Sequence, residues 1–169
     1  MPTSIETSTV ARAAGAKLEE AIRQASSQYF RLVLLAGKPG SGKTAVLQWV
    51  ATKTGYPVVN INLELSKGML ELTRTQRTRQ VERLFKETIA AVPGEVVLLD
   101  NLEILFSTGL EVEPLRLLQV SSRNRTIVAS WNGSFMAGTL TYAEPGHPEF
   151  VQFKQLDAVV IAVGDSTET

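Results

Sequence analysis

The sequence contains no cysteine, which excludes disulfide bonds, thiol catalysis and thiolate metal sites. Neither charge is in excess, because 17 lysines and arginines balance 17 aspartates and glutamates, so there is no global basic signal for nucleic acid. No apolar run approaches the roughly 18 residues that a membrane-spanning helix requires. The polar segment Met1–Thr9 lacks the apolar stretch of a secretory signal. We therefore expect a cytoplasmic protein with no membrane partner.

The composition is that of an ordinary globular domain, with 44% hydrophobic and 20% charged residues in a chain of 169. We expect one domain over residues 1–169, with a flexible tail at residues 1–8 and an amphipathic helix at residues 10–26. Strands alternate with helices after that point, which predicts an α/β fold with a mostly parallel five-stranded sheet flanked by helices. The strands are expected near residues 30–36, 57–63, 95–100, 126–131 and 158–163, and the helices near residues 45–53, 66–91 and 114–121.

The segment Gly37–Thr44 reads GKPGSGKT and fits the phosphate-binding pattern G-x-x-x-x-G-K-[ST] at every fixed position. Its glycines let backbone amides approach phosphate oxygens, and the following helix directs its N-terminus at the same point. We expect Lys43 to contact the terminal phosphates and Thr44 to ligate Mg²⁺. The alternative is an ordinary glycine-rich turn. The expected nucleotide-binding residues are Gly37, Pro39, Gly40, Ser41, Gly42, Lys43 and Thr44.

A second nucleotide motif is suggested by Asp100, which ends the apolar run Val96–Leu99. A carboxylate at the end of a buried strand beside a P-loop holds Mg²⁺ in many P-loop proteins, often through water. The pattern is weak alone, since many strands end in aspartate at a turn or a helix cap. Downstream of the P-loop, it predicts Asp100 as a metal ligand.

The candidates for catalysis are less orthodox. Asn101 occupies the position where many P-loop ATPases have a glutamate, and an amide can orient water but cannot accept its proton. Glu103 and Glu64 are possible substitutes, of which we favour Glu103, although each could equally be a surface carboxylate. Asn132 follows the fourth expected strand and resembles a residue that contacts the terminal phosphate or the water, but Asn132-Gly133 is also a common turn pair. Hydrolysis is therefore expected to be slow or completed by another chain.

Two groups of arginines are candidates for contacts in trans. Either group could supply an arginine finger to a neighbouring subunit or bind the phosphates of DNA or RNA. Solvent-exposed faces with no such role are the third interpretation. The groups are Arg74, Arg77, Arg79 and Arg83 on one expected helix, and Arg123 and Arg125 just before the fourth strand.

With both nucleotide motifs placed, the sequence resembles the AAA type of P-loop ATPases. This resemblance implies ATP as the nucleotide and a strand order of 5-1-4-3-2. Proteins of this type carry a helical lid after the fifth strand, whereas the sequence stops a few residues past Val163. We therefore expect no C-terminal helical lid.

A longer similarity connects the chain with the BrxF family, the small P-loop proteins of BREX bacteriophage-defence systems. The resemblance implies a cytosolic protein of bacteria or archaea that works with other BREX components against phage DNA. The similar segments are Gly37–Thr44, Asn62–Ser66, Leu98–Phe106, Ser122–Thr126 and Thr141–Pro148.

Two functions remain open at this point. The first is a small oligomeric, Mg²⁺-dependent ATPase whose nucleotide state drives assembly with defence partners or DNA. The second is a nucleotide-gated module that binds DNA or protein with negligible hydrolysis, which Asn101 and the expected absence of a lid favour.

Overall fold

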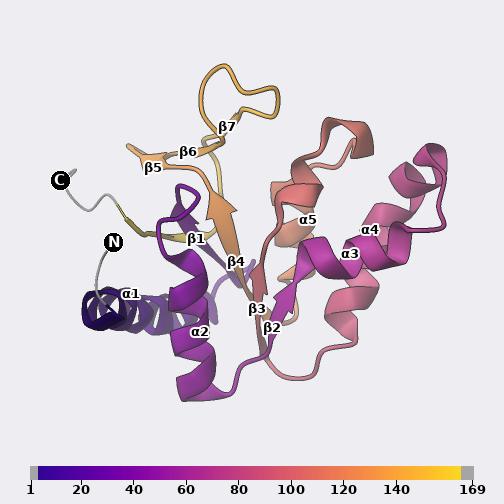
Figure 1. The fold of residues 1–169 in the computed structure, drawn as a ribbon. Helices are drawn as coiled ribbons and strands as arrows, with labels where there is room; N and C mark the ends of the chain where they lie inside the picture. Colours follow the sequence, from indigo (N-terminus) through magenta and orange to yellow (C-terminus); the bar gives the residue numbers. More distant parts are fainter. Residues whose placement is uncertain (1–3, 165–169) are drawn as a thin grey trace.

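The fold is centred on a parallel five-stranded sheet with the strand order β2-β3-β4-β1-β8 (Figure 1). It is taken from a computed structural model that describes residues 4–164, with side chains from Thr9 onward. Read from β8 to β2, with the strands numbered one to five in chain order, this is the order 5-1-4-3-2. The strand order that the AAA resemblance implies is therefore confirmed. The strands are β1 (Leu32–Gly37), β2 (Val58–Asn60), β3 (Val96–Asp100), β4 (Thr126–Asn132) and β8 (Val159–Ala162).

Helices cover both faces of this sheet because its central strands are apolar on both sides. Successive side chains of a strand point to opposite faces, and Leu32 and Leu34 accordingly belong to one hydrophobic core while Val33 and Leu35 belong to the other. Figure 1 shows the two helical layers. One consists of α1 (Ser4–Ala25) and α2 (Lys43–Thr54), and the other of α3 (Ile61–Met69), α4 (Arg74–Ala90) and α5 (Pro114–Ser121).

Three expected boundaries are wrong. Helix α1 begins at Ser4, so the expected tail does not extend to residue 8, and its residues 1–3 lie outside the described part of the chain. Strand β2 ends at Asn60, whose side-chain oxygen accepts a hydrogen bond from the Leu63 amide at 3.0 Å and so caps α3. The long helix expected at residues 66–91 is two helices, because Thr73 and Gln76 form a capping box that starts α4.

A small antiparallel sheet that is absent from the expected strands follows β4. It consists of β5 (Phe135–Met136), β6 (Thr139–Tyr142) and β7 (Val151–Phe153). Figure 1 shows it beyond the carboxyl end of β4, on the same side of the molecule as the loop after β1. Two short 3-10 helices, η1 (Glu103–Phe106) and η2 (Thr108–Leu110), follow β3.

The helices between residues 4 and 164 include none that combines the length and the apolar character needed to cross a membrane.

Candidate nucleotide-binding site

The P-loop joins the carboxyl end of β1 to the first turn of α2. Gly40 and Gly42 have φ angles of 80° and 103°, which a residue with a side chain adopts only with strain. Gly37 needs the absence of a side chain for another reason, since a Cβ there would collide with the Ser41 hydroxyl and the Val163 carbonyl. The motif's glycines are therefore required by the backbone path that shapes the loop.

Lys43 lies inside this loop with only 7% of its surface exposed. Its ammonium donates hydrogen bonds to the carbonyls of Gly37 at 2.7 Å and Lys38 at 2.9 Å. Burial lowers the pKa of Lys43, while the negative charges of Asp100 and Glu103 act in the opposite direction. The chain thus places a buried cation within the curve of the loop.

Asp100 is joined directly to Thr44, as the expected metal pair requires. The Thr44 hydroxyl donates to Oδ2 of Asp100 at 2.7 Å. The other carboxylate oxygen, Oδ1, accepts from the Ser130 hydroxyl at 2.7 Å and from the backbone N–H of Asn101 at 3.0 Å. Sequence reasoning missed Ser130, although a buried polar residue within the apolar strand β4 was a usable signal.

These side chains fit a Mg²⁺ site of the kind found with nucleotides. A hydroxyl and a carboxylate provide hard oxygen ligands, and Mg²⁺ is usually held by one or two such groups together with phosphate oxygens and water. Within the described part of the chain there is no cluster of three or more histidines and acidic residues that would hold a metal alone. Thr44 and Asp100 would therefore hold the ion as partners of a bound nucleotide.

The Glu103 carboxylate is held by two asparagine side chains, one from the end of β4 and one from the first turn of α3. Its Oε1 accepts from the Asn132 amide at 2.6 Å, and its Oε2 accepts from the Asn62 amide at 2.8 Å. The orientation of Asn62 is set by its own oxygen, which accepts from the backbone amide of Ile104 at 2.8 Å. The structure therefore brings the two expected residues Glu103 and Asn132 into direct contact, and adds Asn62, which sequence reasoning missed.

The other two catalytic candidates lie differently. Asn101 adopts a left-handed backbone conformation with φ of 55°, which asparagine tolerates better than most residues. Its carbonyl accepts from the backbone N–H of Asn62 at 2.8 Å, so its backbone joins the turn after β3 to α3. Glu64 lies on α3 and forms a surface ion pair with Lys67 at 3.6 Å.

The arginines fall into two different settings. Arg123 and Arg125 precede β4 and therefore lie at the amino ends of the parallel strands, away from the P-loop. Arg125 donates to the carbonyls of Ile89 and Val92, at 3.0 and 2.9 Å, and so closes the end of α4. Arg123 stacks on the ring of Tyr29 and donates to its carbonyl. The exposed arginines of α4 are Arg74, Arg77, Arg79 and Arg83.

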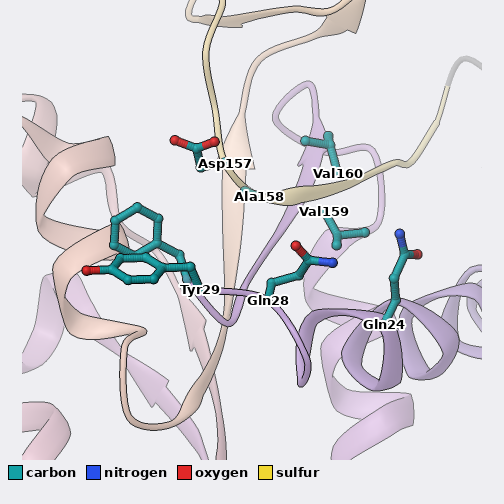
Figure 2. Close-up of a pocket in the computed structure, with 8 residues that line it drawn as sticks. Gln24, Gln28, Tyr29, Asp157, Ala158, Val159 and Val160 are labelled. Atoms are coloured by element: carbon teal, nitrogen blue, oxygen red, sulfur yellow. The ribbon is translucent and has the colours of Figure 1, made fainter.

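Two cavities differ in their relation to this site. One of about 210 Å³ lies between the P-loop and the small sheet, and Lys38, Asn132 and Gln152 are among the residues that line it. A larger hollow of about 690 Å³ lies at the amino ends of β1 and β8, where Gln24 and Gln28 face β8 (Figure 2). Because the P-loop is at the opposite ends of these strands, the smaller cavity is the one that belongs to the nucleotide site.

The model of the AAA family, "ATPase family associated with various cellular activities", matches residues 33–124, which is more than half of the chain. The chain belongs to the AAA family of ATPases. This AAA domain is 27% identical over 90 residues to the vesicular-fusion protein SEC18 of Candida albicans, which covers 53% of the chain and 11% of that protein. The solved structure of PCH-2 from C. elegans aligns with 94% of the chain and 41% of its own length, at 20% identity and a TM-score of 0.43.

Membership of the AAA family implies nucleotide binding, with ATP as the nucleotide. The matched segment contains the P-loop, Asp100 and Glu103. It ends before Asn132 and before the small sheet, so these parts of the AAA domain are not assigned by the family match. The chain spans about a tenth of the curated relative, as the share of 11% shows.

Proposed function

We propose that the chain is a Mg²⁺-dependent ATP-binding switch with weak or partner-dependent hydrolysis. The observation that carries this proposal is the convergence of Lys43, Thr44 and Asp100 at one end of β1 and β3, with Thr44 bonded to Asp100 at 2.7 Å. In the ATP-bound state, Lys43 would exchange its loop carbonyls for phosphate oxygens, and Thr44 and Asp100 would hold Mg²⁺. The bound ion would neutralise part of the phosphate charge.

Glu103 is the residue that we propose for hydrolysis. Its carboxylate would orient a water molecule toward the terminal phosphate and take a proton from it, while Asn132 contacts the same water or the phosphate. Each Glu103 oxygen accepts one hydrogen bond from an asparagine amide and keeps a second lone pair that can accept a bond from water. Weak hydrolysis by the chain alone is supported instead by Asn101, which stands where many P-loop ATPases have the catalytic glutamate.

The partners follow from the resemblance to BrxF. We propose that the switch acts in the cytoplasm of a bacterium or archaeon, as a homo-oligomer and with other BREX components, in defence against phage. The exposed arginines of α4, Arg74, Arg77 and Arg79, are candidates for contacts with DNA or with a neighbouring nucleotide site. Arg123 and Arg125 are weaker candidates for a neighbouring nucleotide site because they lie at the amino ends of the strands, away from the P-loop, and bond to backbone carbonyls of Tyr29 and Ile89 there.

A nucleotide-gated binding module without hydrolysis is the second candidate function. It is supported by Asn101, which stands where many P-loop ATPases have the catalytic glutamate and whose backbone serves a turn. In this case the hydrogen bonds between Glu103 and its two asparagine partners would hold the ends of β3 and β4 together. Glu103 would then not activate water.

Calorimetry and phosphate release separate these functions. The wild-type chain should bind ATP only with Mg²⁺, and Glu103→Gln should keep that affinity while turnover falls by about 100-fold, as expected for loss of a general base. Glu64→Gln is the matched control, because Glu64 lies in a surface ion pair, and it should turn over as wild type does. Absence of ATP binding would overturn the proposal, and ATP binding without turnover under all conditions would favour the second function.

A further inference from the structure

The 3-10 helix that carries Glu103 is held from two sides. On one side are the amides of Asn62 and Asn132, which bond to the Glu103 carboxylate. On the other side is an aromatic cluster that includes Phe106, the last residue of the same 3-10 helix. Only two residues lie between Glu103 and Phe106 in this 3-10 helix, so a displacement of the Phe106 ring would move the carboxylate.

Phe106 rests on Tyr142 of β6. The two rings are stacked with an interplanar angle of 6° and their centroids 3.4 Å apart. Trp131, the residue before Asn132, meets both rings edge-on, with centroids at 5.0 Å from Phe106 and 6.0 Å from Tyr142. All three side chains are buried. The two edge-on contacts of Trp131 have the geometry and spacing in which aromatic pairs contribute beyond the area that they bury, so Trp131 holds both stacked rings in place.

The small sheet holds Tyr142 in the aromatic cluster. Tyr142 pairs with Val151 of β7, and the carbonyl of the neighbouring Thr141 accepts a hydrogen bond from the Trp131 indole at 2.9 Å. The Ala143 amide donates to the carbonyl of Asn132 at 3.0 Å. Strand β6 and the residue after it are therefore bonded to Trp131 and to Asn132, the residue of β4 that contacts Glu103.

Tyr142 is a buried tyrosine whose hydroxyl remains protonated at neutral pH. Burial raises the pKa of Tyr142 to about 12, and the negative charges of Glu149 and Glu103 act in the same direction. The neutral ring of Tyr142 thus contacts the 3-10 helix of Glu103 through Phe106.

We propose that Tyr142 is a positioning residue for Glu103, which makes the small sheet a required part of the hydrolytic site. The inference rests on the proposed function, because it assigns to Glu103 a role in turnover. The ring of Tyr142 fixes Phe106, and Phe106 fixes the 3-10 helix that presents the carboxylate. Nucleotide binding itself does not depend on this contact, since the P-loop and Asp100 are held by β1, β3 and β4.

The test compares Tyr142→Leu, which removes the ring, with Tyr142→Phe, which keeps the ring and loses the hydroxyl. Tyr142→Leu should lower kcat by about tenfold or more, since small misplacements of a reacting group are costly, while the Kd for ATP changes by less than about threefold. Tyr142→Phe should recover most of the lost turnover. Tyr29→Leu, at an exposed aromatic at the other end of the sheet, is the control and should match wild type.

A double-mutant comparison isolates the action through Glu103. If Tyr142 acts only on this carboxylate, Tyr142→Leu should not lower the residual turnover of Glu103→Gln any further. An equal fold-loss in both backgrounds would overturn the inference, as would a Tyr142→Phe variant as slow as Tyr142→Leu. Phe106→Leu removes the other ring of the stack and decides the question if Tyr142→Leu does not fold. Absence of turnover in the wild type would overturn the proposed hydrolysis and this inference together, whereas turnover with additive losses would overturn this inference alone.

Discussion

Lys43 combines a functional charge with an unfavourable position in the folded chain. Its pKa is lowered by burial, which means that the fold disfavours the charged form relative to the unfolded chain. Between the lowered pKa and the ordinary value of 10.5, the unfolded chain binds more protons than the folded chain, so the free energy of unfolding rises with pH in that window. At neutral pH the charged lysine is therefore a cost to stability that nucleotide binding would offset.

Replacing Lys43 should separate function from stability. Lys43→Met keeps the length of the side chain without its charge, so we expect ATP affinity to fall by at least about 100-fold while the melting temperature stays equal or rises. Calorimetry and thermal unfolding at pH 7 measure the two effects. The advantage of the variant in stability should shrink as the pH approaches 10.5. Lys38→Met, in the variable part of the loop, should keep most of the affinity, and a large fall in the melting temperature of Lys43→Met would contradict the argument.

At the scale of elements, the hairpin between β5 and β6 and the segment that leads into it from β4 show why the sequence did not predict this region. Asn132-Gly133 has the composition of a tight turn, but the turn is made by Ala137 and Gly138, whose φ angles are 50° and 79°. Alanine is uncommon at the first of these positions, so the hairpin carried no usable signal. Asn132 instead ends β4 and bonds to Glu103.

Gly133 allows two backbones to approach closely. A Cβ at this position would collide with the backbone of Thr141, and the Gly133 amide donates to the carbonyl of Gly37 at 3.1 Å. Gly133 thus lies where the P-loop, β4 and the small sheet meet. The close approach of these backbones, and not a tight turn, explains the Asn132-Gly133 pair.

We expect Gly133→Ala to destabilise the protein by about 3 kcal/mol or more, because the collision involves backbone that cannot move without separating β4 from β6. Gly138→Ala is the matched control in the same hairpin. A Cβ at Gly138 meets open space, so this change should cost only the left-handed backbone strain of about 1 kcal/mol. Urea unfolding of the two variants measures the difference. Equal losses would show that close approach is not what requires Gly133.

At the scale of the whole molecule, the parallel sheet was predictable because its strands are continuous apolar runs and its P-loop has a fixed pattern. The order of the strands needed the family resemblance, since spacing does not say which strands are neighbours. The direct contacts of Asp100 with Thr44 and of Glu103 with Asn132 were expected only as proximity. Asn62 escaped prediction because its role depends on a contact with Glu103, which is far from it in the chain. Ser130 had a usable signal that was missed, and the small sheet had none because Ala137 lies in its turn.

The last prediction concerns assembly. Glu103 already has two asparagine partners, while the arginines of α4 are exposed and the cavity between the P-loop and the small sheet opens beside Asn132. If a second copy completes the site, the mass of the protein in solution should increase with ATP and Mg²⁺ together and with neither alone. Light scattering coupled to size exclusion measures this, with Glu103→Gln used to preserve the nucleotide during the run.

Arginine variants test whether α4 faces the nucleotide site of a neighbouring copy. Arg79→Ala should reduce the ATP-dependent increase in mass or the turnover of the assembled form if α4 faces a neighbouring site, because a cation in trans stabilises the charge that develops on the phosphates. Arg125→Ala should instead lower stability, since its guanidinium bonds the carboxyl end of α4. A chain that remains monomeric with ATP and Mg²⁺ would exclude a site shared between two copies. DNA would then be the remaining candidate partner of the α4 arginines. Binding to DNA phosphates must weaken steeply as salt is added.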